Sequence, residues 1–160
     1  MAKKALLIFI SAIMLAGCGY TMILTGKDAA FTIYPAQVSN YSKDLSATSQ
    51  FRDSVKLYLT TINALAEKDE ADYSGEFILQ KVESSGSSTS SASTSVYVRI
   101  TVSVKIYGKE GRIFEKTFTA SENYDNTNSQ SATRNNKDLA VNKAIERTMM
   151  DFRNAFEQRK

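Results

Sequence analysis

The 160-residue sequence predicts an α+β fold: a two-layer sandwich in which a four-stranded mixed sheet carries two helices packed on one face. Three observations lead to this prediction. Two segments repeat apolar residues every three or four positions, which is the period of an amphipathic helix. Residues 96–107 alternate between apolar and polar side chains, which is the period of a strand with one buried face. The resulting order is strand, helix, three strands and helix, with no internal repeat or second domain.

The first 17 residues have the composition of a signal peptide. Lys3 and Lys4 precede a segment, residues 5–16, that is apolar apart from Ser11. This segment is shorter than the roughly 20 residues that cross a membrane, but it suits the apolar part of a secretory signal. We therefore expect residues 1–17 to be removed on export.

The only cysteine of the chain, Cys18, follows this segment directly. The motif LAGC that ends at Cys18 resembles the lipobox of bacterial lipoproteins, and this resemblance implies that the thiol is acylated and that Cys18 becomes the first mature residue. We expect a lipidated tether over residues 18–30 and a single domain over residues 31–160. The alternative is an uncleaved anchor, or an ordinary signal peptide that happens to be followed by a cysteine.

The composition argues against several classes of function. The chain has 20 basic and 17 acidic residues, and two of the basic ones lie in the expected signal peptide, so the mature net charge is about +1. A charge this small gives no general attraction to nucleic acid. The sequence contains no histidine, which excludes Ser-His and Cys-His catalysis and histidine metal sites. We expect a binding protein without metal or cofactor, and not an enzyme.

The first two elements are a strand and a helix. The strand is expected over residues 31–40, where Pro35 lacks a backbone donor and therefore confines the segment to a sheet edge. The helix is expected over residues 48–67, with Thr48 or Ser49 as its N-cap. Its apolar stripe consists of Phe51, Val55, Tyr58, Leu59, Ile62 and Ala66.

Three strands should follow the helix. Residues 72–82 alternate in their first half, and residues 96–107 give the clearest strand signal in the chain. The apolar set of this second strand is Val96, Val98, Ile100, Val102, Val104 and Ile106, and the polar set is Tyr97, Arg99, Thr101, Ser103, Lys105 and Tyr107. Residues 108–111, GKEG, predict a tight turn, after which residues 112–120 return antiparallel.

Two polar segments are expected to be loops, and a helix closes the domain. Residues 84–95 are serine-rich with no apolar side chain larger than alanine, and residues 122–136 are similarly polar. Because successive strands alternate in direction, both loops should emerge at one end of the sheet, opposite the 108–111 turn. The last helix is expected from Lys137 to the C-terminus, with an apolar stripe of Val141, Ile145, Met149, Phe152 and Phe156.

A lipobox followed by this order of elements resembles the LPS-assembly lipoprotein (LptE) family. The resemblance covers nearly all of the expected mature chain, and none of its motifs is a catalytic signature. It rests on CGY at residues 18–20, VSNYS at 38–42, ADYSGEFIL at 71–79, the alternating strand at 96–107 and NYDN at 123–126.

The resemblance implies a role in lipopolysaccharide transport. Members of that family are anchored by lipid in the inner leaflet of the outer membrane and face the periplasm. They plug the lumen of the large, LptD-like β-barrel that inserts lipopolysaccharide into the outer leaflet, and they help it assemble. The implied partners of this chain are therefore that barrel, lipopolysaccharide, and outer-membrane lipid through acylated Cys18.

The resemblance also implies basic side chains that meet lipid A phosphates at the loop end of the domain. Arg134 and Lys137 follow NYDN at a matching distance, and such side chains bind phosphate through charge-assisted hydrogen bonds. The sequence departs from the family at residues 84–95, where no basic residue occurs. For Arg134 the alternative is a solvated charge near the start of a helix.

The polar face of the long strand is the second candidate site. Tyr97, Arg99, Lys105 and Tyr107 share this face, and tyrosine and arginine are enriched in tightly packed interfaces. We expect these four residues to contact a partner. The alternative function is a free-standing, periplasm-facing lipoprotein adaptor that binds peptidoglycan or a secretion complex, since small α+β domains serve several roles.

Overall fold

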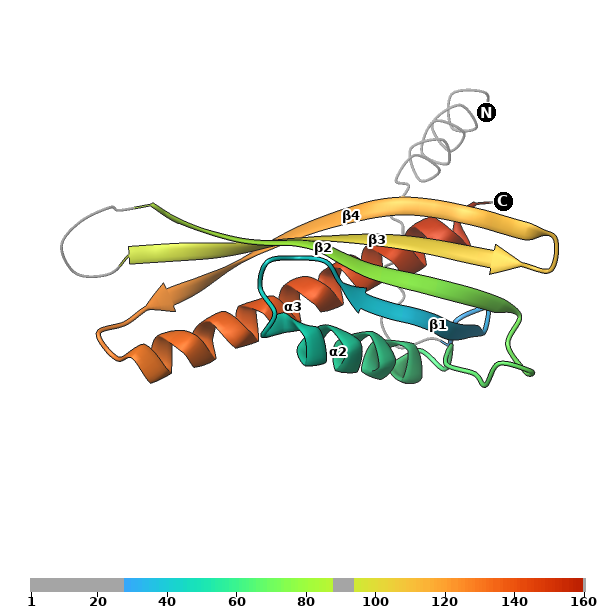
Figure 1. Cartoon of the computed structure of the whole chain (residues 1–160), viewed down its shortest axis with the longest axis horizontal. Coiled ribbons are helices and arrows are strands. Elements are labelled where there is room, and N and C mark those ends of the chain that lie inside the picture. The colour runs from blue at the N-terminus through green and yellow to red at the C-terminus, as the bar shows by residue number, and fades with distance from the viewer. Residues whose placement is uncertain (1–27, 88–93, 160) are drawn as a thin grey trace, which may run out of the picture.

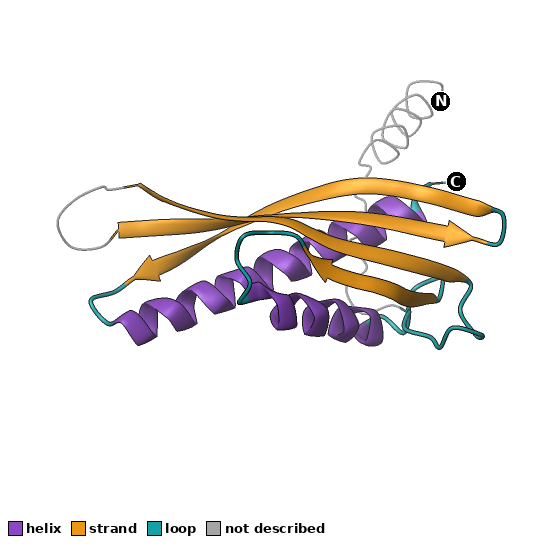
Figure 2. Ribbon diagram, viewed as in Figure 1, coloured by secondary structure: helices purple, strands orange, loops and turns teal. Residues whose placement is uncertain are grey.

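The computed structural model describes residues 28–87 and 94–159 of the chain. The signal peptide, Cys18 and most of the tether lie outside the described residues. The elements are β1 (Ile33–Asn40), α2 (Ala47–Thr61), β2 (Tyr73–Ser87), β3 (Thr94–Gly108), β4 (Gly111–Asn126) and α3 (Gln130–Glu157). The predicted α+β fold is confirmed: a four-stranded mixed sheet forms one layer and both helices cover the same face of it (Figure 1, Figure 2).

The strand order across the sheet is β1-β2-β3-β4. β1 lies parallel to β2 because α2 carries the chain back between them, whereas β2–β3 and β3–β4 are antiparallel pairs. β1 is an edge strand, as Pro35 predicted, and its pairing register shifts between Pro35 and Gln37. Figure 1 places the end of β2, the start of β3 and the β4–α3 connection at one end of the sheet and the β3–β4 turn at the other, as expected.

The apolar face of β3 forms the centre of the core. Val98 through Ile106 on this face have no solvent exposure, and they pack beneath apolar residues of both helices. From the helices, the fully buried or nearly buried partners are Phe51, Val55, Leu59, Val141, Ile145, Met149, Phe152 and Phe156. α3 therefore buries its whole predicted stripe. α2 buries Phe51, Val55 and Leu59 of its stripe, whereas Tyr58 is half-buried and Ala66 lies beyond the end of the helix.

Phe152 of α3 is the centre of an aromatic cluster within this core. Its ring centroid lies 5.6–6.4 Å from those of five other phenylalanines, mostly in edge-to-face arrangements. These rings come from the segment before β1, from β2, from β4 and from α3 itself: Phe31, Phe77, Phe114, Phe118 and Phe156. The cluster ties the sheet to α3 near the C-terminus of the chain.

The boundaries of α2 differ from the prediction. The helix begins at Ala47 with Ser46 as its N-cap, so neither Thr48 nor Ser49 caps it. It ends at Thr61 because Asn63 adopts a left-handed conformation with φ of 52°. The chain then runs beside β1, where Ile33 donates its amide to the Ala64 carbonyl at 2.7 Å.

Both expected loops are largely regular structure. β2 continues to Ser87 and β3 begins at Thr94, so most of the described part of segment 84–95 pairs as strand. The side chains of Ser84 and Ser85 are exposed, but backbone pairing does not require large side chains. β4 likewise continues to Asn126, and α3 begins at Gln130 rather than Lys137, so only residues 127–129 connect them.

The ends of these elements have clear local causes. Ser129 is the N-cap of α3, and its hydroxyl accepts a hydrogen bond from the Ala132 amide at 3.4 Å. The β3–β4 turn is tight as expected, with Gly111 at a φ of 124° that favours glycine. No helix in the described part of the chain is long and apolar enough to cross a membrane.

Phe152→Ala should destabilise the domain by about 3–5 kcal/mol, because it removes a fully buried ring from the aromatic cluster. Denaturant unfolding measures the loss. Leu57→Ala is the control: this side chain is 69% exposed, so its removal should change the free energy of unfolding by less than about 0.5 kcal/mol. Equal losses in the two variants would contradict the described core.

Candidate functional site

The sheet face opposite the helices carries the four predicted interface residues. Tyr97, Arg99, Lys105 and Tyr107 lie on this face of β3, which no described helix covers (Figure 2). Arg99 is exposed, and the other three side chains are half-buried by their neighbours on the sheet. The structure thus brings these four residues together on one surface, which we call the outer face, and their contact with a partner stays a prediction.

Neighbouring strands satisfy the charges of the outer face. The Lys105 ammonium lies 3.7 Å from a carboxylate oxygen of Glu76 in β2. Arg99 donates from Nε to the Ser121 hydroxyl at 3.2 Å, and its guanidinium lies 5.6 Å from the centre of the Tyr97 ring. A partner would therefore meet a surface with paired charges rather than a strong field of one sign.

Hydroxyl groups fill the middle of the outer face, and tyrosines mark its ends. Thr101 and Thr119 stand opposite each other with their hydroxyl oxygens 3.4 Å apart, and Ser103 is nearly buried at 5% exposure. At the β3–β4 turn, Tyr107 lines a shallow hollow of about 480 Å³ together with Tyr34 and Tyr73. Tyrosine is enriched in protein interfaces, so the two ends of the outer face are the places where we expect a partner to pack most closely.

The two predicted phosphate-binding residues lie in α3, and not in a loop. Arg134 is exposed near the start of the helix, at the end of the sheet where β2 ends and β3 begins. Lys137 lies one turn further on, and its ammonium forms an ion pair with the Asp44 carboxylate at 2.7 Å. Lys137 therefore joins α3 to the segment between β1 and α2. Of the two predicted residues, only Arg134 has no ion pair with the described residues.

Asp44 organises that junction. Burial alone would raise the pKa of its carboxyl group, but hydrogen bonds and charge from Lys137, together with hydrogen bonds from Ser46, outweigh burial and hold this pKa below its usual value. The Asp44 carbonyl accepts a hydrogen bond from the Asn40 side chain at 2.8 Å. The contact is thus built into the fold, which favours a structural role for Lys137.

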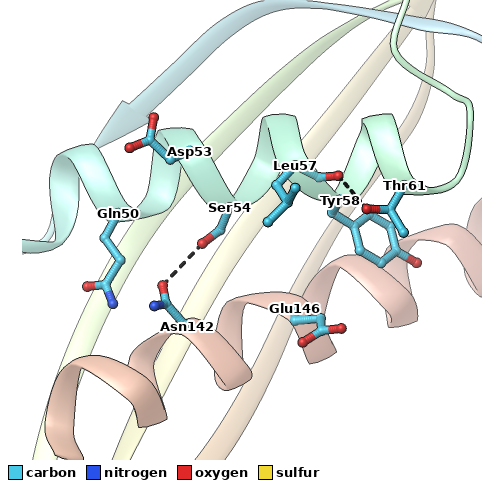
Figure 3. Close-up of a pocket in the computed structure, with 8 residues that line it drawn as sticks. All are labelled: Gln50, Asp53, Ser54, Leu57, Tyr58, Thr61, Asn142 and Glu146. Carbon is cyan, nitrogen blue, oxygen red and sulfur yellow. Dashed lines mark hydrogen bonds between the residues drawn. The ribbon is translucent and has the colours of Figure 1, made fainter. Parts of the chain in front are cut away.

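A groove between the two helices was not predicted from the sequence. It has a volume of about 580 Å³ (Figure 3) and its lining residues are Gln50, Asp53, Ser54, Leu57, Tyr58, Thr61, Asn142 and Glu146. The helices run parallel here, with Gln50 donating to the Asp138 carbonyl at 2.6 Å and Ser54 donating to Asn142 at 3.2 Å. In the sequence, this groove corresponds to the polar residues that lie beside the apolar stripe of each helix.

Tyr58 closes one end of this groove. Burial raises the pKa of its phenol to about 12, an increase that the neighbouring Arg153 guanidinium opposes. Arg153 is 5% exposed, pairs with Glu157 at 3.2 Å and donates to the Asp28 carbonyl at 3.3 Å. This buried arginine joins the start of the described chain to the end of α3.

Comparison with known proteins bears on the fold. No family model matches the chain, and no curated protein matches it. Its fold is similar to that of a DUF330-family protein from Xanthomonas campestris, with a TM-score of 0.52 and 11% sequence identity, over 84% of this chain and 94% of that one.

Two further solved structures are described as lipoproteins. A minor lipoprotein from Acinetobacter baumannii has a TM-score of 0.48 at 18% identity, covering 81% of this chain and 95% of its own. Rare lipoprotein B from Shewanella oneidensis has a TM-score of 0.39 at 16% identity, covering 76% of this chain and 99% of its own. At these identities the comparisons concern the fold alone.

Asp44→Asn should lower stability at pH 7 by about 0.5–1 kcal/mol, because it removes the ion pair with Lys137. The folded-state pKa of Asp44 is depressed, so its contribution is present above the unfolded value near 3.8 and is lost as pH falls through the folded value. The variant and the parent should therefore converge in acid, as measured by denaturant unfolding across pH.

Glu115→Gln provides the control for this prediction. The Arg112–Glu115 pair is close at 2.6 Å, but both side chains are about half exposed, so its loss should have little effect at any pH. An Asp44→Asn defect that persisted unchanged below the folded-state pKa would show that the carboxylate charge is not its cause.

Proposed function

We propose that this protein is an outer-membrane lipoprotein that plugs the β-barrel translocon for lipopolysaccharide, helps that barrel assemble, and so supports lipopolysaccharide transport to the cell surface. The observation that carries the proposal is the uncovered outer face of the sheet, with Tyr97 and Tyr107 toward its two ends, in a chain whose lipobox motif ends at Cys18. Both helices occupy the opposite face, so the outer face is available for a partner.

The proposed chemistry is binding alone. Acylated Cys18 would hold the domain at the periplasmic side of the outer membrane. The outer face would then contact the inner wall of the barrel, where paired charges such as Lys105–Glu76 cost less to desolvate than isolated ones. Hydroxyl groups such as that of Thr101 offer both donors and acceptors to a polar wall.

Direct contact with lipopolysaccharide would fall to one end of the domain. Arg134 supports this part of the proposal, since its guanidinium is exposed and is free of ion pairs with the described residues. Lys137 supports it less well, because its ammonium is already paired with Asp44. The described parts of the serine-rich segment, residues 84–87 and 94–95, add no basic side chain.

The proposal is tested by affinity purification of the tagged, exported protein from detergent-solubilised membranes, followed by mass spectrometry. A large outer-membrane β-barrel should be recovered in roughly equal amount. Combined Tyr97→Ala and Tyr107→Ala changes should lower this recovery, because they remove the aromatic anchors of the outer face. Lys143→Ala, on the exposed side of α3, is the matched control and should recover the barrel as the parent does.

The outcomes separate the two candidate functions. Recovery of the protein alone would contradict the barrel partner. Recovery with peptidoglycan fragments, or with a secretion complex, would favour the free-standing adaptor instead. Loss of the barrel from the Lys143→Ala control as well would show that the effect does not come from the outer face.

Arg134→Ala should weaken the retention of purified lipopolysaccharide on the immobilised protein while leaving its melting temperature unchanged. The reason is that Arg134 is exposed and makes no hydrogen bond or ion pair with the described residues. Lys137→Ala should instead lower the melting temperature, because it leaves Asp44 unpaired. Retention that is unaffected by Arg134→Ala would contradict a phosphate contact at this position.

A further inference from the structure

The two edges of the sheet differ in their protection against pairing with another strand. β1 spans eight residues, contains Pro35 and has a register shift beside it. A short strand, a proline and a bulge each discourage pairing at an edge. β4 forms the opposite edge and spans 16 residues without a proline. Within the described residues no strand pairs with its outer side, so β4 presents a long row of backbone donors and acceptors.

The regular part of β4 is suited to pairing. Its register with β3 shifts only near its start, beside Ile106 and Tyr107, and residues 114–126 then follow without interruption. Phe114, Phe118 and Tyr124 lie on its helix-facing side together with Lys116 and Glu122. This side of the strand therefore combines aromatic surface with one charge of each sign.

The charge of Lys116 determines which kind of strand can pair with the β4 edge. Its side chain is exposed, lies 5.6 Å from the centre of the Phe118 ring and has no ion pair within the described residues. A charged side chain on the core side of an edge strand normally opposes pairing. Lys116 favours pairing only when the incoming strand places a carboxylate opposite its ammonium group.

A second copy of β4 supplies that carboxylate in one register. In an antiparallel pair centred on Thr119, Lys116 of each copy stands opposite Glu122 of the other, and Phe114 stands opposite Tyr124. A pair centred one residue earlier places Phe114 opposite Glu122, and a pair centred one residue later places Glu115 opposite Asp125. Opposite charges attract and like charges repel across directly opposed strand positions, so the register at Thr119 is favoured over both of its neighbours.

The environment of Glu122 accommodates a second cation. Its Oε1 accepts a hydrogen bond from Arg147 at 2.7 Å, and a carboxylate has lone pairs for further donors. The two-fold axis of such a pair is normal to the sheet, so the helices of both copies stay in one layer.

We propose that this protein forms a two-fold symmetric homodimer in which β4 pairs antiparallel with β4 of a second copy, centred on Thr119. The two four-stranded sheets become one continuous sheet. The dimer is proposed for the protein outside the barrel, because the proposed plug has one copy of the domain per barrel. Its failure would leave the proposed function standing, and failure of the barrel pull-down would leave the dimer standing.

Disulfide trapping tests the dimer in the exported, full-length chain. Thr119→Cys places two thiols opposite each other across the axis, where facing Cβ atoms approach to about 4.5 Å. A disulfide spans about 3.5–4.5 Å between Cβ atoms, so a small local adjustment closes the bond. A dimer should therefore appear on a non-reducing gel. Thr101→Cys is the matched control, since Thr101 is the partner of Thr119 in β3 on the same face. Its two copies would be about 14 Å apart across three strand spacings, beyond disulfide reach. The parent chain controls for linkage through Cys18.

A second experiment tests the register. In the proposed pairing Thr117 stands opposite Ser121, so co-expressed Thr117→Cys and Ser121→Cys chains with different tags should cross-link to each other more than to themselves. Lys116→Glu should lower the yield of the Thr119→Cys dimer, whereas Lys143→Glu, with the same change of charge, should not. Equal cross-linking of Thr119→Cys and Thr101→Cys, or a monomer in both, would overturn the proposal.

Discussion

The alternating pattern of β3 is the constraint on which the rest of the structure depends. Five of its side chains, from Val98 to Ile106, are removed from water on one face. Burial of such side chains provides about 1.5–3 kcal/mol each, and only a covering layer of apolar surface can provide it. Two amphipathic helices form that layer, and because they use only one face of the sheet, the other face remains polar. The position of the core and the position of the candidate site therefore have the same cause.

Polar contacts at the ends of the helical layer fix how the helices lie on this apolar face. Asp44 and Lys137 join the start of α2 to the start of α3, and Arg153 with Glu157 joins the end of α3 to the chain at Asp28. Apolar packing alone tolerates sliding and rotation, whereas hydrogen-bonded charges are directional. Lys137, which the sequence offered as a phosphate-binding residue, is thus part of this framework, and its contact with phosphate stays a prediction.

The spacing of apolar residues predicted the elements that bury side chains. It did not predict the segments whose side chains stay exposed. The core faces of α2, β3 and α3 were predictable because each repeats with a fixed period. The end of α2 was not, because it depends on the left-handed backbone of Asn63 and on the pairing of the following residues with Ile33. No apolar stripe marks the first two turns of α3 or the serine-rich end of β2, so the sequence predicted loops at both places. For the site, the face shared by Tyr97 and Tyr107 followed from alternation, whereas the pairing of Lys137 with Asp44 joins residues far apart in sequence.

The serine-rich end of the β2–β3 pair gives the sheet a gradient of rigidity. Near Tyr107 the strands rest on α3 and on the aromatic rings around Phe152. Toward Ser84 and Ser85 the side chains are exposed, and backbone pairing with β3 provides most of what holds them. Segments with few buried contacts open at a lower free energy than the core. The serine-rich end of β2 should therefore open at a lower free energy than the end near Tyr107, which packs against the core.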